Sequence, residues 1–415
     1  MQDDQYENQE NNKKHLKKKD NEDMDMKIED EEKINNLQKT MTKFLSEHTI
    51  YEAIPEDMKI LVFNDELLIK DSIEAMIKED IYCGLLYNSE QNKHSGIFTI
   101  RDVLGLLLIG YKKLVSFLNN NRNINSYDDL KANLNSFFAQ FDNQNINKSS
   151  NNNKNYIKTN NQNNMDIEED DDNLNDNEPK IYNKIIKNFS QFTSLFDNIT
   201  LQSFIELFHI KGNSSNLISL FSDSNLEECI KTIKKNNIHR LIVQDRKSNN
   251  FSGFITYETI FEYFIENYYS SMNEFKISLK NLDIIVKNII TLNKKESLHK
   301  GMETFYKEGI SMIPITDDDG DIFGYFYLKD IIYFFSTGEK FNFNFTIEDF
   351  LKDLYEDVDI EIPYGKTRIV EVEESSDLKH VFEQMSISPE RKLIIRKNSK
   401  IGVVALYDIF KKLII

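Results

Sequence analysis

Four glycines mark similar segments of this chain, at Gly96, Gly253, Gly324 and Gly402. Each glycine begins a short apolar run, typical of a strand, that leads into an expected helix. The second and third glycines are 71 residues apart, the third and fourth 78, and the first and second 157. A repeat of this length indicates similar supersecondary units packed against one another, so it constrains the fold more strongly than any single residue does.

Each of the four copies shows the order β-α-β-β-α. Apolar spacing of the helical kind alternates with β-branched and aromatic runs that are bounded by polar turns. The expected fold is therefore a mixed α/β (α+β) protein of four tandem repeats. The first copy comprises strand 59–63, helix 67–78, strands 82–87 and 96–99 and a helix from 102; the second, helix 226–235, strands 239–244 and 253–256 and helix 259–268; the third, helix 298–307, strands 312–316 and 322–327 and helix 330–335; the fourth, a strand from 370, helix 378–385, strands 392–396 and 402–405 and a final helix.

Two segments do not fit the repeat. Their composition is dominated by Asp, Glu, Lys, Asn and Gln, which cannot bury enough apolar surface to offset the entropy of ordering. Removing the second segment restores the repeat spacing, as expected of a tolerated surface insertion. The expected organisation is a disordered tail over 1–40, repeat 1 over 44–118, an Asn-rich insertion over 119–190, repeat 2 over 200–270, repeat 3 over 278–338 and repeat 4 over 345–415.

Charge and cysteine content restrict the partners and the compartment. The net charge of −18 argues against nucleic acid as a partner. Cys83 and Cys229 lie in apolar patterns without metal-ligand spacing and indicate buried thiols in a reducing compartment. No secretory signal and no run long enough to span a membrane are expected. The predicted location is cytoplasmic. The lysines at 13–14 and 17–19 allow a nuclear import signal as an alternative to a solvated arm.

An aspartate follows the repeat glycine by six residues in three copies, as Asp102, Asp330 and Asp408, and the second copy has Thr259 there. Thr99 and Asp102 have the spacing of a capping box, so a purely structural role at the helix start is one interpretation. The third and fourth copies lack the threonine but keep the acid. This favours a binding role for the aspartates.

The run from Asp317 to Asp321 could be taken for a calcium loop. The alternating ligand spacing and the glutamate at the twelfth position are missing, however. An Asp-Gly turn between two apolar runs is typical of a β-hairpin, which we predict here.

The repeats resemble the cystathionine β-synthase (CBS) domain, whose signature is a glycine, two apolar residues, Ser or Thr, two further residues and Asp. Four copies, with the Asp missing from the second, resemble the γ regulatory subunits of AMP-activated protein kinases. The residues that carry this resemblance are the segment 96–102, the segment 238–241 (Ile-His-Arg-Leu) and the lead-in 44–55.

The resemblance implies two Bateman modules of paired repeats that form a disc, with AMP, ADP and ATP as regulatory ligands in the clefts. The aspartates would accept hydrogen bonds from ribose hydroxyls, while basic side chains would meet phosphates. The residues implied in nucleotide binding are Thr99, Asp102, His239, Arg240, Ser311, Asp330, Arg391, Lys392 and Asp408. His239 and Ser311 also fit structural roles at strand entries.

Two positions depart from the family pattern. Tyr82 stands where the family has a phosphate-facing arginine, and Glu258 stands where it has a lysine. Both changes alter the phosphate side of the expected sites. In the fourth copy, Arg391 and Lys392 replace a His-Arg pair, which keeps positive charge but changes its geometry.

The resulting hypothesis is a non-catalytic, nucleotide-sensing subunit whose partners are a kinase catalytic (α) subunit and a bridging β subunit, with no nucleic acid and no catalytic cofactor or metal. The alternative is a scaffold of CBS repeats with degenerate or empty sites. An enzyme is disfavoured because the chain has no P-loop, no dinucleotide fingerprint, no zinc-protease motif and no kinase signature.

Overall fold

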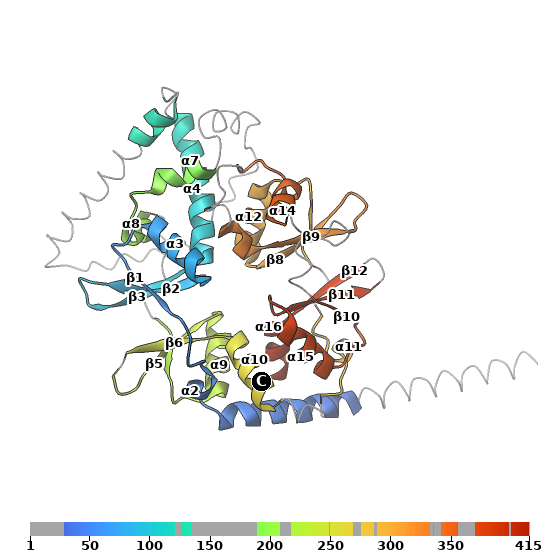
Figure 1. Cartoon of the computed structure of the whole chain (residues 1–415). Coiled ribbons are helices and arrows are strands. Elements are labelled where there is room, and N and C mark those ends of the chain that lie inside the picture. Colours follow the sequence, from blue (N-terminus) through green and yellow to red (C-terminus); the bar gives the residue numbers. More distant parts are fainter. Residues whose placement is uncertain are drawn as a thin grey trace, which may run out of the picture. The chain divides into compact units, whose positions relative to one another are not determined.

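The structure is a computed structural model, and it describes residues 29–120, 124, 126–133, 189–207, 217–248, 250–268, 275–285, 289–332, 335, 342–355, 370–397 and 400–414. The chain divides into two compact units. Unit 1 consists of residues 1–59, 218–290 and 365–415, and unit 2 consists of residues 60–217 and 291–364. The repeats of copies 2 and 4 therefore lie in unit 1, and those of copies 1 and 3 lie in unit 2 (Figure 1).

Every copy contains the same three-stranded sheet. The first strand pairs in parallel with the middle strand, and the middle strand pairs antiparallel with the third. Copy 1 has β1 (Leu61–Asn64), α3 (Ile69–Glu79), β2 (Cys83–Asn88), β3 (Lys93–Thr99) and α4 (Ile100–Asn120); copy 2 has β4 (Ser219–Phe221), α9 (Leu226–Asn236), β5 (Leu241–Gln244), β6 (Phe251–Ile255) and α10 (Tyr257–Tyr268).

The other two copies repeat this arrangement, which confirms the predicted β-α-β-β-α order. In copy 3 the helix predicted over 330–335 begins as a short 3₁₀ helix, and residues 333–334 lie outside the described residues. Copy 3 has β7 (Leu292–Asn293), α12 (Leu298–Glu308), β8 (Met312–Thr316), β9 (Ile322–Tyr327) and η4 (Leu328–Ile332); copy 4 has β10 (Val370–Val372), α15 (Leu378–Ile387), β11 (Lys392–Lys397), β12 (Lys400–Ala405) and α16 (Leu406–Leu413).

A short lead-in helix precedes each copy, and it packs on a different copy from the one it introduces. These helices are α2 (Ile50–Ala53), α8 (Leu201–Leu207), α11 (Leu279–Leu282) and α14 (Ile347–Leu354). The start of α2 lies beside the start of α9 in copy 2, and the start of α8 lies beside α3 in copy 1. Likewise, α11 starts beside α15 in copy 4, and α14 starts beside α12 in copy 3. Copies 1 and 2 thus exchange lead-in helices, as do copies 3 and 4.

The same backbone hydrogen bonds hold all four exchanges. Where α2 meets α9, Ile50 N donates to Ser224 O (2.9 Å), Tyr51 N donates to Ser222 O (2.8 Å) and Leu226 N donates to His48 O (2.9 Å). The donors are first-turn N–H groups, which have no partner inside their own helix. Each lead-in helix and its neighbour therefore satisfy one another's unpaired groups.

Two separate apolar cores belong to the two units. In unit 2, the core joins α4 of copy 1 with α12 of copy 3, and it includes the fully buried residues Leu104, Leu107, Met302 and Phe305. In unit 1, the core joins α10 of copy 2 with α15 and α16 of copy 4. The arrangement of the two units relative to each other, and with it the expected disc, stays a prediction.

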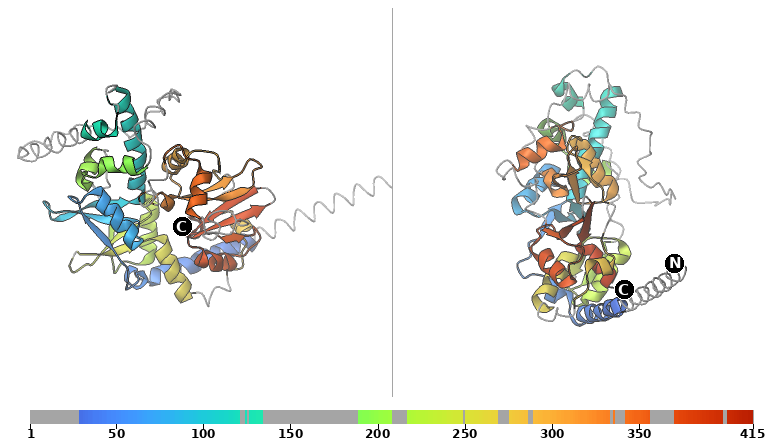
Figure 2. Two further views of the ribbon diagram at one scale, coloured as in Figure 1. Left: turned by 45° about the horizontal axis from the view of Figure 1, so that its top comes forward. Right: turned by 90° about the vertical axis from the view of Figure 1, so that its right-hand side faces the viewer.

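Part of the segment predicted as a disordered tail is helical, which corrects the prediction for residues 29–40. A helix covers residues 29–47, and Leu37, Met41 and Phe44 are buried in the core of unit 1. These apolar residues recur every three or four positions and form one face of the helix. Gln38 Nε2 donates to Lys412 O of α16 at 3.0 Å. In Figure 2 this helix, in blue, runs along the edge of its unit. Residues 1–28 lie outside the described residues.

The ends of the predicted insertion are also ordered. Residue 126 forms a bend and residues 127–133 form a helix in which Leu130 is fully buried. At the other end of the insertion in the sequence lies α7 (Phe189–Thr193). Tyr127 Oη donates to Gln191 O at 3.1 Å and also bonds Ser194 Oγ. The two ends of the insertion therefore lie together on unit 2. Residues 134–188 lie outside the described residues.

Among the helices that the structure describes, none has both the length and the apolar character needed to cross a membrane.

We expect the backbone exchange to contribute measurably to stability, and Tyr51 allows a clean test. Its side chain is 77% exposed, so Tyr51→Ala should change the free energy of unfolding little. Tyr51→Pro removes the N–H that bonds Ser222 O. Tyr51 lies in the first turn of α2, and the first turn of a helix tolerates proline. The proline variant should be less stable by about 1 kcal/mol or more in urea unfolding. Equal stability of the two variants would contradict a role for this bond.

Candidate functional site

The junction between the third strand and the second helix of each copy places the repeated aspartates. In copy 1, Thr99 ends β3 and Asp102 lies in the first turn of α4. The backbone N–H of Thr99 donates to Asp102 Oδ2 at 2.6 Å, and the Thr99 hydroxyl donates to the same oxygen at 2.7 Å. The carboxylate is therefore fixed at the helix start by the strand that precedes it.

The other two aspartates have the same backbone partner without the threonine. Tyr327 N donates to Asp330 Oδ2 at 2.8 Å, and Ala405 N donates to Asp408 Oδ2 at 3.0 Å. Keeping the acid without the threonine therefore does not by itself indicate a binding role. Losing the threonine removes only its hydroxyl from the junction, and the acid still receives the backbone N–H in copies 3 and 4. Each aspartate thus has a structural role in addition to any binding role.

Burial makes the charge of these aspartates costly. It raises the pKa of Asp102 above the ordinary 3.8, and the hydrogen bonds from Thr99 oppose that rise in pKa. Burial also raises the pKa of Asp408, against the bond from Ala405 N. Asp330 is only 6% exposed. A partly desolvated carboxylate gains from further hydrogen-bond donors, and a pair of ribose hydroxyls supplies them.

In copy 2 the aspartate position of the same junction holds an uncharged threonine. Thr259 is 8% exposed, and its hydroxyl lies 3.2 Å from the hydroxyl of Thr256. The Thr256 hydroxyl accepts the backbone N–H of Thr259 at 3.2 Å. Two threonines therefore satisfy each other where the other copies present a carboxylate.

His239 and Arg240 lie in the short link between α9 and β5. Asn237 ends α9 in the left-handed conformation, and Ile238 N bonds back to Ile233 O at 3.2 Å. The chain then turns sharply into β5. His239 is exposed and Arg240 is partly exposed, so both basic side chains can be reached by a ligand.

Arg391 occupies the corresponding link of copy 4, but its guanidinium bonds to the protein. Arg391 itself has a positive φ of 48°. Its Nη1 donates to the carbonyl oxygens of Met385 (3.0 Å) and Ser388 (3.4 Å) and to that of Ser386, at the end of α15. Its Nη2 donates to Glu262 Oε1 of α10 at 2.7 Å. The arginine therefore caps α15 and bridges copies 4 and 2.

The remaining candidates lie at strand entries. Lys392 begins β11 and pairs in register with Ala405, next to the junction that holds Asp408. Ser311 immediately precedes β8 and is partly buried; its carbonyl oxygen accepts Leu328 N at 2.9 Å. Ser311 thus bonds Leu328, the residue directly after Tyr327, whose N–H donates to Asp330.

The two departures from the family pattern have different surroundings. The Tyr82 hydroxyl donates to Asp80 Oδ1 at 2.5 Å, so a local bond occupies it. Glu258 is exposed, and its charge is screened by water more than a buried charge would be. The carboxylate that does face an arginine in this region is Glu262, which the sequence did not single out.

Each unit brings together its own subset of the predicted residues. Unit 2 holds Thr99, Asp102, Ser311 and Asp330, and unit 1 holds the other five: His239, Arg240, Arg391, Lys392 and Asp408. Arg101 was not predicted from the sequence; its guanidinium crosses from copy 1 to copy 3 within unit 2. Its place directly before Asp102 was the available signal.

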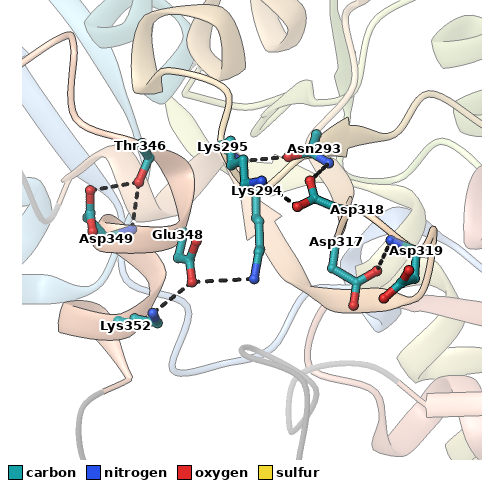
Figure 3. A network of polar contacts seen from close by, with 10 residues as sticks. All are labelled: Asn293, Lys294, Lys295, Asp317, Asp318, Asp319, Thr346, Glu348, Asp349 and Lys352. Atoms are coloured by element: carbon teal, nitrogen blue, oxygen red, sulfur yellow. Dashed lines mark hydrogen bonds and ion pairs between the residues drawn. The ribbon is translucent and has the colours of Figure 1, made fainter.

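The acidic run of copy 3 forms the predicted hairpin turn. Asp317 Oδ1 accepts the backbone N–H groups of Asp319 (3.0 Å) and Asp321 (2.9 Å), and Gly320 has a φ of 86°. Asp318 bonds Lys295 and accepts from Asn293 Nδ2 at 3.2 Å (Figure 3). The side chains of Asp317 and Asp318 therefore bond the hairpin turn and the residues beside it. Across the described part of the chain, no group of three or more His, Cys, Asp or Glu side chains could hold a metal ion.

Comparison with known proteins identifies the repeats. The CBS domain family matches residues 210–266 and 282–337, which correspond to copies 2 and 3. Copies 1 and 4 have the same topology. The chain therefore contains CBS domains.

Two curated relatives carry the name 5′-AMP-activated protein kinase subunit gamma. The protein from Dictyostelium discoideum is 34% identical over 85 residues, which is 20% of this chain and 15% of that protein. The protein from Saccharomyces cerevisiae is 25% identical over 68 residues, 16% of this chain and 21% of that protein. The aligned segments thus span about a fifth or less of these relatives.

A solved structure extends the likeness to most of the chain. It is a protein from Methanocaldococcus jannaschii described as a proposed archaeal homologue of g-AMPK. The TM-score is 0.54 at 14% identity, over 88% of this chain and 99% of that one. At this identity the likeness shows the fold, and the fold agrees with a mixed α/β protein of tandem CBS repeats.

Substituting Asp102 should separate its charge from its hydrogen bonds. Asp102→Asn removes the charge but keeps an oxygen that can accept from Thr99, whereas Asp102→Ala loses the acceptor and should cost about 1 kcal/mol of stability. A raised pKa means that the folded chain binds this proton more tightly than the unfolded chain does. Wild-type stability from Asp102 is therefore present below 3.8 and is lost as the pH rises through the folded pKa.

The free energies of unfolding of wild type and Asp102→Asn, measured in urea at several pH values from about 4 to about 7, test this expectation. The difference should shift in favour of Asn as the pH rises. A difference that does not change with pH would mean that burial leaves the Asp102 pKa where it is in the unfolded chain.

Proposed function

We propose that this chain of CBS repeats is a non-catalytic regulatory subunit of an AMP-activated-type serine/threonine kinase complex, and that it binds AMP, ADP and ATP. The observation that carries the proposal is the repeated junction. Three copies fix a partly or fully buried carboxylate at the start of a helix, and the second copy has a neutral threonine pair there. This is the pattern of ribose-binding positions that the family resemblance implies.

The junction suits reversible recognition of a nucleoside. The bonds from the backbone set the position of each carboxylate before a ligand arrives, so little ordering cost remains at binding. In Asp102 and Asp408 the bonds from the protein fall on Oδ2. A ribose diol would donate to the carboxylate and offset part of its desolvation.

Phosphate recognition in this proposal falls mainly on His239 and Arg240 in copy 2 and on Lys392 in copy 4. His239 and Arg240 lie just before β5, and Lys392 is the first residue of β11. Their side chains can supply charge-assisted hydrogen bonds to phosphate. Arg391 contributes less to phosphate binding in this proposal, because its guanidinium already bonds the end of α15 and Glu262.

Regulation would follow from differential binding. AMP, ADP and ATP share the ribose and adenine but differ in phosphate charge, so they bind two conformations of a kinase complex with different affinities. The shift in the conformational equilibrium is then no larger than that difference in affinity. A kinase catalytic subunit and a bridging β subunit are the proposed partners, in the cytoplasm and, through the lysine-rich arm, in the nucleus.

The alternative function is a scaffold with degenerate sites. Two observations favour it: Tyr82 replaces a phosphate-facing arginine and bonds Asp80, and Arg391 is committed to a helix end. A scaffold would bind the same protein partners without responding to nucleotide.

Calorimetric titration of the chain with AMP tests ribose binding at the junctions. Asp102→Asn, Asp330→Asn and Asp408→Asn should each weaken binding at one position about tenfold or more, because a carboxylate acceptor is replaced by an amide. Thr259→Ser is the matched control, since it changes the same repeat position in the copy that lacks the acid; it should leave the affinity unchanged.

Two results would count against the nucleotide proposal. One is an equal loss of affinity from Thr259→Ser and the aspartate variants, which would indicate a general effect on folding. The other is the absence of any heat with AMP, ADP or ATP at millimolar concentration, which would favour the scaffold.

Purification of the native complex tests membership of a kinase assembly. Mass spectrometry of the proteins that co-purify with the full chain should identify a serine/threonine kinase catalytic subunit in near-stoichiometric amount. Kinase activity of that complex should change with AMP, and the response should weaken with Asp102→Asn. A complex with a kinase whose activity does not change with nucleotide would favour the scaffold. A preparation without a kinase would contradict the proposed partners of both the sensing subunit and the scaffold.

A further inference from the structure

Arg101 is the second residue of α4 and directly precedes Asp102. Its backbone is held tightly, because Ile100 N donates to Tyr82 O at 3.1 Å and Thr99 bonds Asp102 on either side of it. The equivalent positions of the other copies hold Glu258, Lys329 and Tyr407. Copy 1 is thus distinguished by an arginine at this position.

The Arg101 side chain reaches the end of a helix in another copy. Nη2 donates to Gly309 O at 2.5 Å and to Ile310 O at 3.3 Å, and Nη1 donates to Phe305 O at 3.5 Å. These carbonyls belong to the last turn of α12 and the residues that follow it. The last carbonyls of a helix lack intrahelical partners and carry partial negative charge, which a guanidinium complements.

The residues that Arg101 holds lead directly into the second candidate position of unit 2. Gly309 and Ile310 are followed by Ser311, whose carbonyl oxygen accepts Leu328 N at 2.9 Å. The preceding residue, Tyr327, donates its N–H to Asp330. A continuous set of hydrogen bonds and chain neighbours therefore runs from Asp102 through Arg101 to Asp330.

Unit 1 connects copies 2 and 4 by other contacts, among them the rings of Tyr257 and Tyr407, whose centroids lie 5.6 Å apart. There α15 is capped by Arg391, which belongs to copy 4 itself, and copy 2 contributes Glu262 to hold that arginine. The cap on α12 comes instead from the residue beside the candidate ribose position of a different copy. This cap links the Asp102 junction to the chain segment that leads to the Asp330 junction.

We infer that Arg101 is a positioning residue that couples nucleotide binding at the Asp102 junction to nucleotide binding at the Ser311 and Asp330 junction. The inference rests on the proposed function. A nucleotide that shifts the start of α4 moves the guanidinium, and the guanidinium moves the entry of β8 against which the second nucleotide would bind. Linkage requires that the effect be equal in the other direction.

The test measures the coupling itself in full chains that also carry Asp408→Asn, so that the two positions of unit 2 remain. AMP affinity at the Asp330 position is measured with the Asp102 position filled, from the second step of a two-site titration, and with the Asp102 position kept largely empty by Asp102→Asn, which weakens binding there. With Arg101 present, the two affinities should differ by about fivefold or more. With Arg101→Gln, they should agree.

Arg101→Lys and Arg246→Gln complete the design. Lysine keeps the charge at the helix end but cannot span three carbonyls, so it should retain only part of the coupling, and it serves if the glutamine variant fails to fold. Arg246 pairs with Asp223 at 2.7 Å in unit 1, so Arg246→Gln should leave the coupling intact. Far-UV circular dichroism and the urea midpoint verify folding of each variant.

The possible outcomes distinguish this inference from the proposed function. A purely structural cap would lower the urea midpoint and weaken both positions together, with the ratio of affinities unchanged by Arg101→Gln; that result overturns the coupling. Two positions that bind AMP independently in the Arg101 chain also overturn the coupling and leave the proposed function intact. No binding of AMP by the full chain overturns both.

Discussion

The paired helix starts hold this protein together. At each of four places, the first N–H groups of a lead-in helix bond to carbonyls just before the first helix of another repeat, which returns a bond of its own. Without that neighbour, both helix ends would leave buried donors unsatisfied. Because the bonds use the backbone, they depend on the turn into each helix more than on any one side chain. Ser, Thr, Asn and Asp at most of these N-caps provide those turns.

The fold was largely predictable from the sequence, for identifiable reasons. Runs such as 241–244 and 312–316, bounded by turn residues, have one reasonable interpretation as strands, and Asp317 to Asp321 follows the chemistry of a hairpin. Helix 29–47 was missed because acidic and amide residues dominate its composition and conceal the apolar spacing of Leu37, Met41 and Phe44. The exchange of lead-in helices was also missed, since no local pattern states which copy a helix will pack on.

The candidate site was less predictable because several of its side chains have two roles. The spacing located Asp102, Asp330 and Asp408 at equivalent junctions, but it could not show that each also accepts a backbone N–H. The charge of Arg391 suggested phosphate, whereas its left-handed backbone turns the guanidinium toward the end of α15. In such a site, stability and recognition depend on the same atoms. Asparagine variants are more informative than alanine variants for this reason.

The reciprocal exchange changes what the peptide chain between copies 1 and 2 does. The long insertion separates them in sequence, yet α2, which precedes copy 1, packs on copy 2, and α8, which follows the insertion, packs on copy 1. A protease cut between residues 134 and 188 would therefore produce two polypeptides, each with a helix packed on the other. Such fragments would stay associated as a noncovalent pair, and separately produced halves could reassemble without any engineered linker.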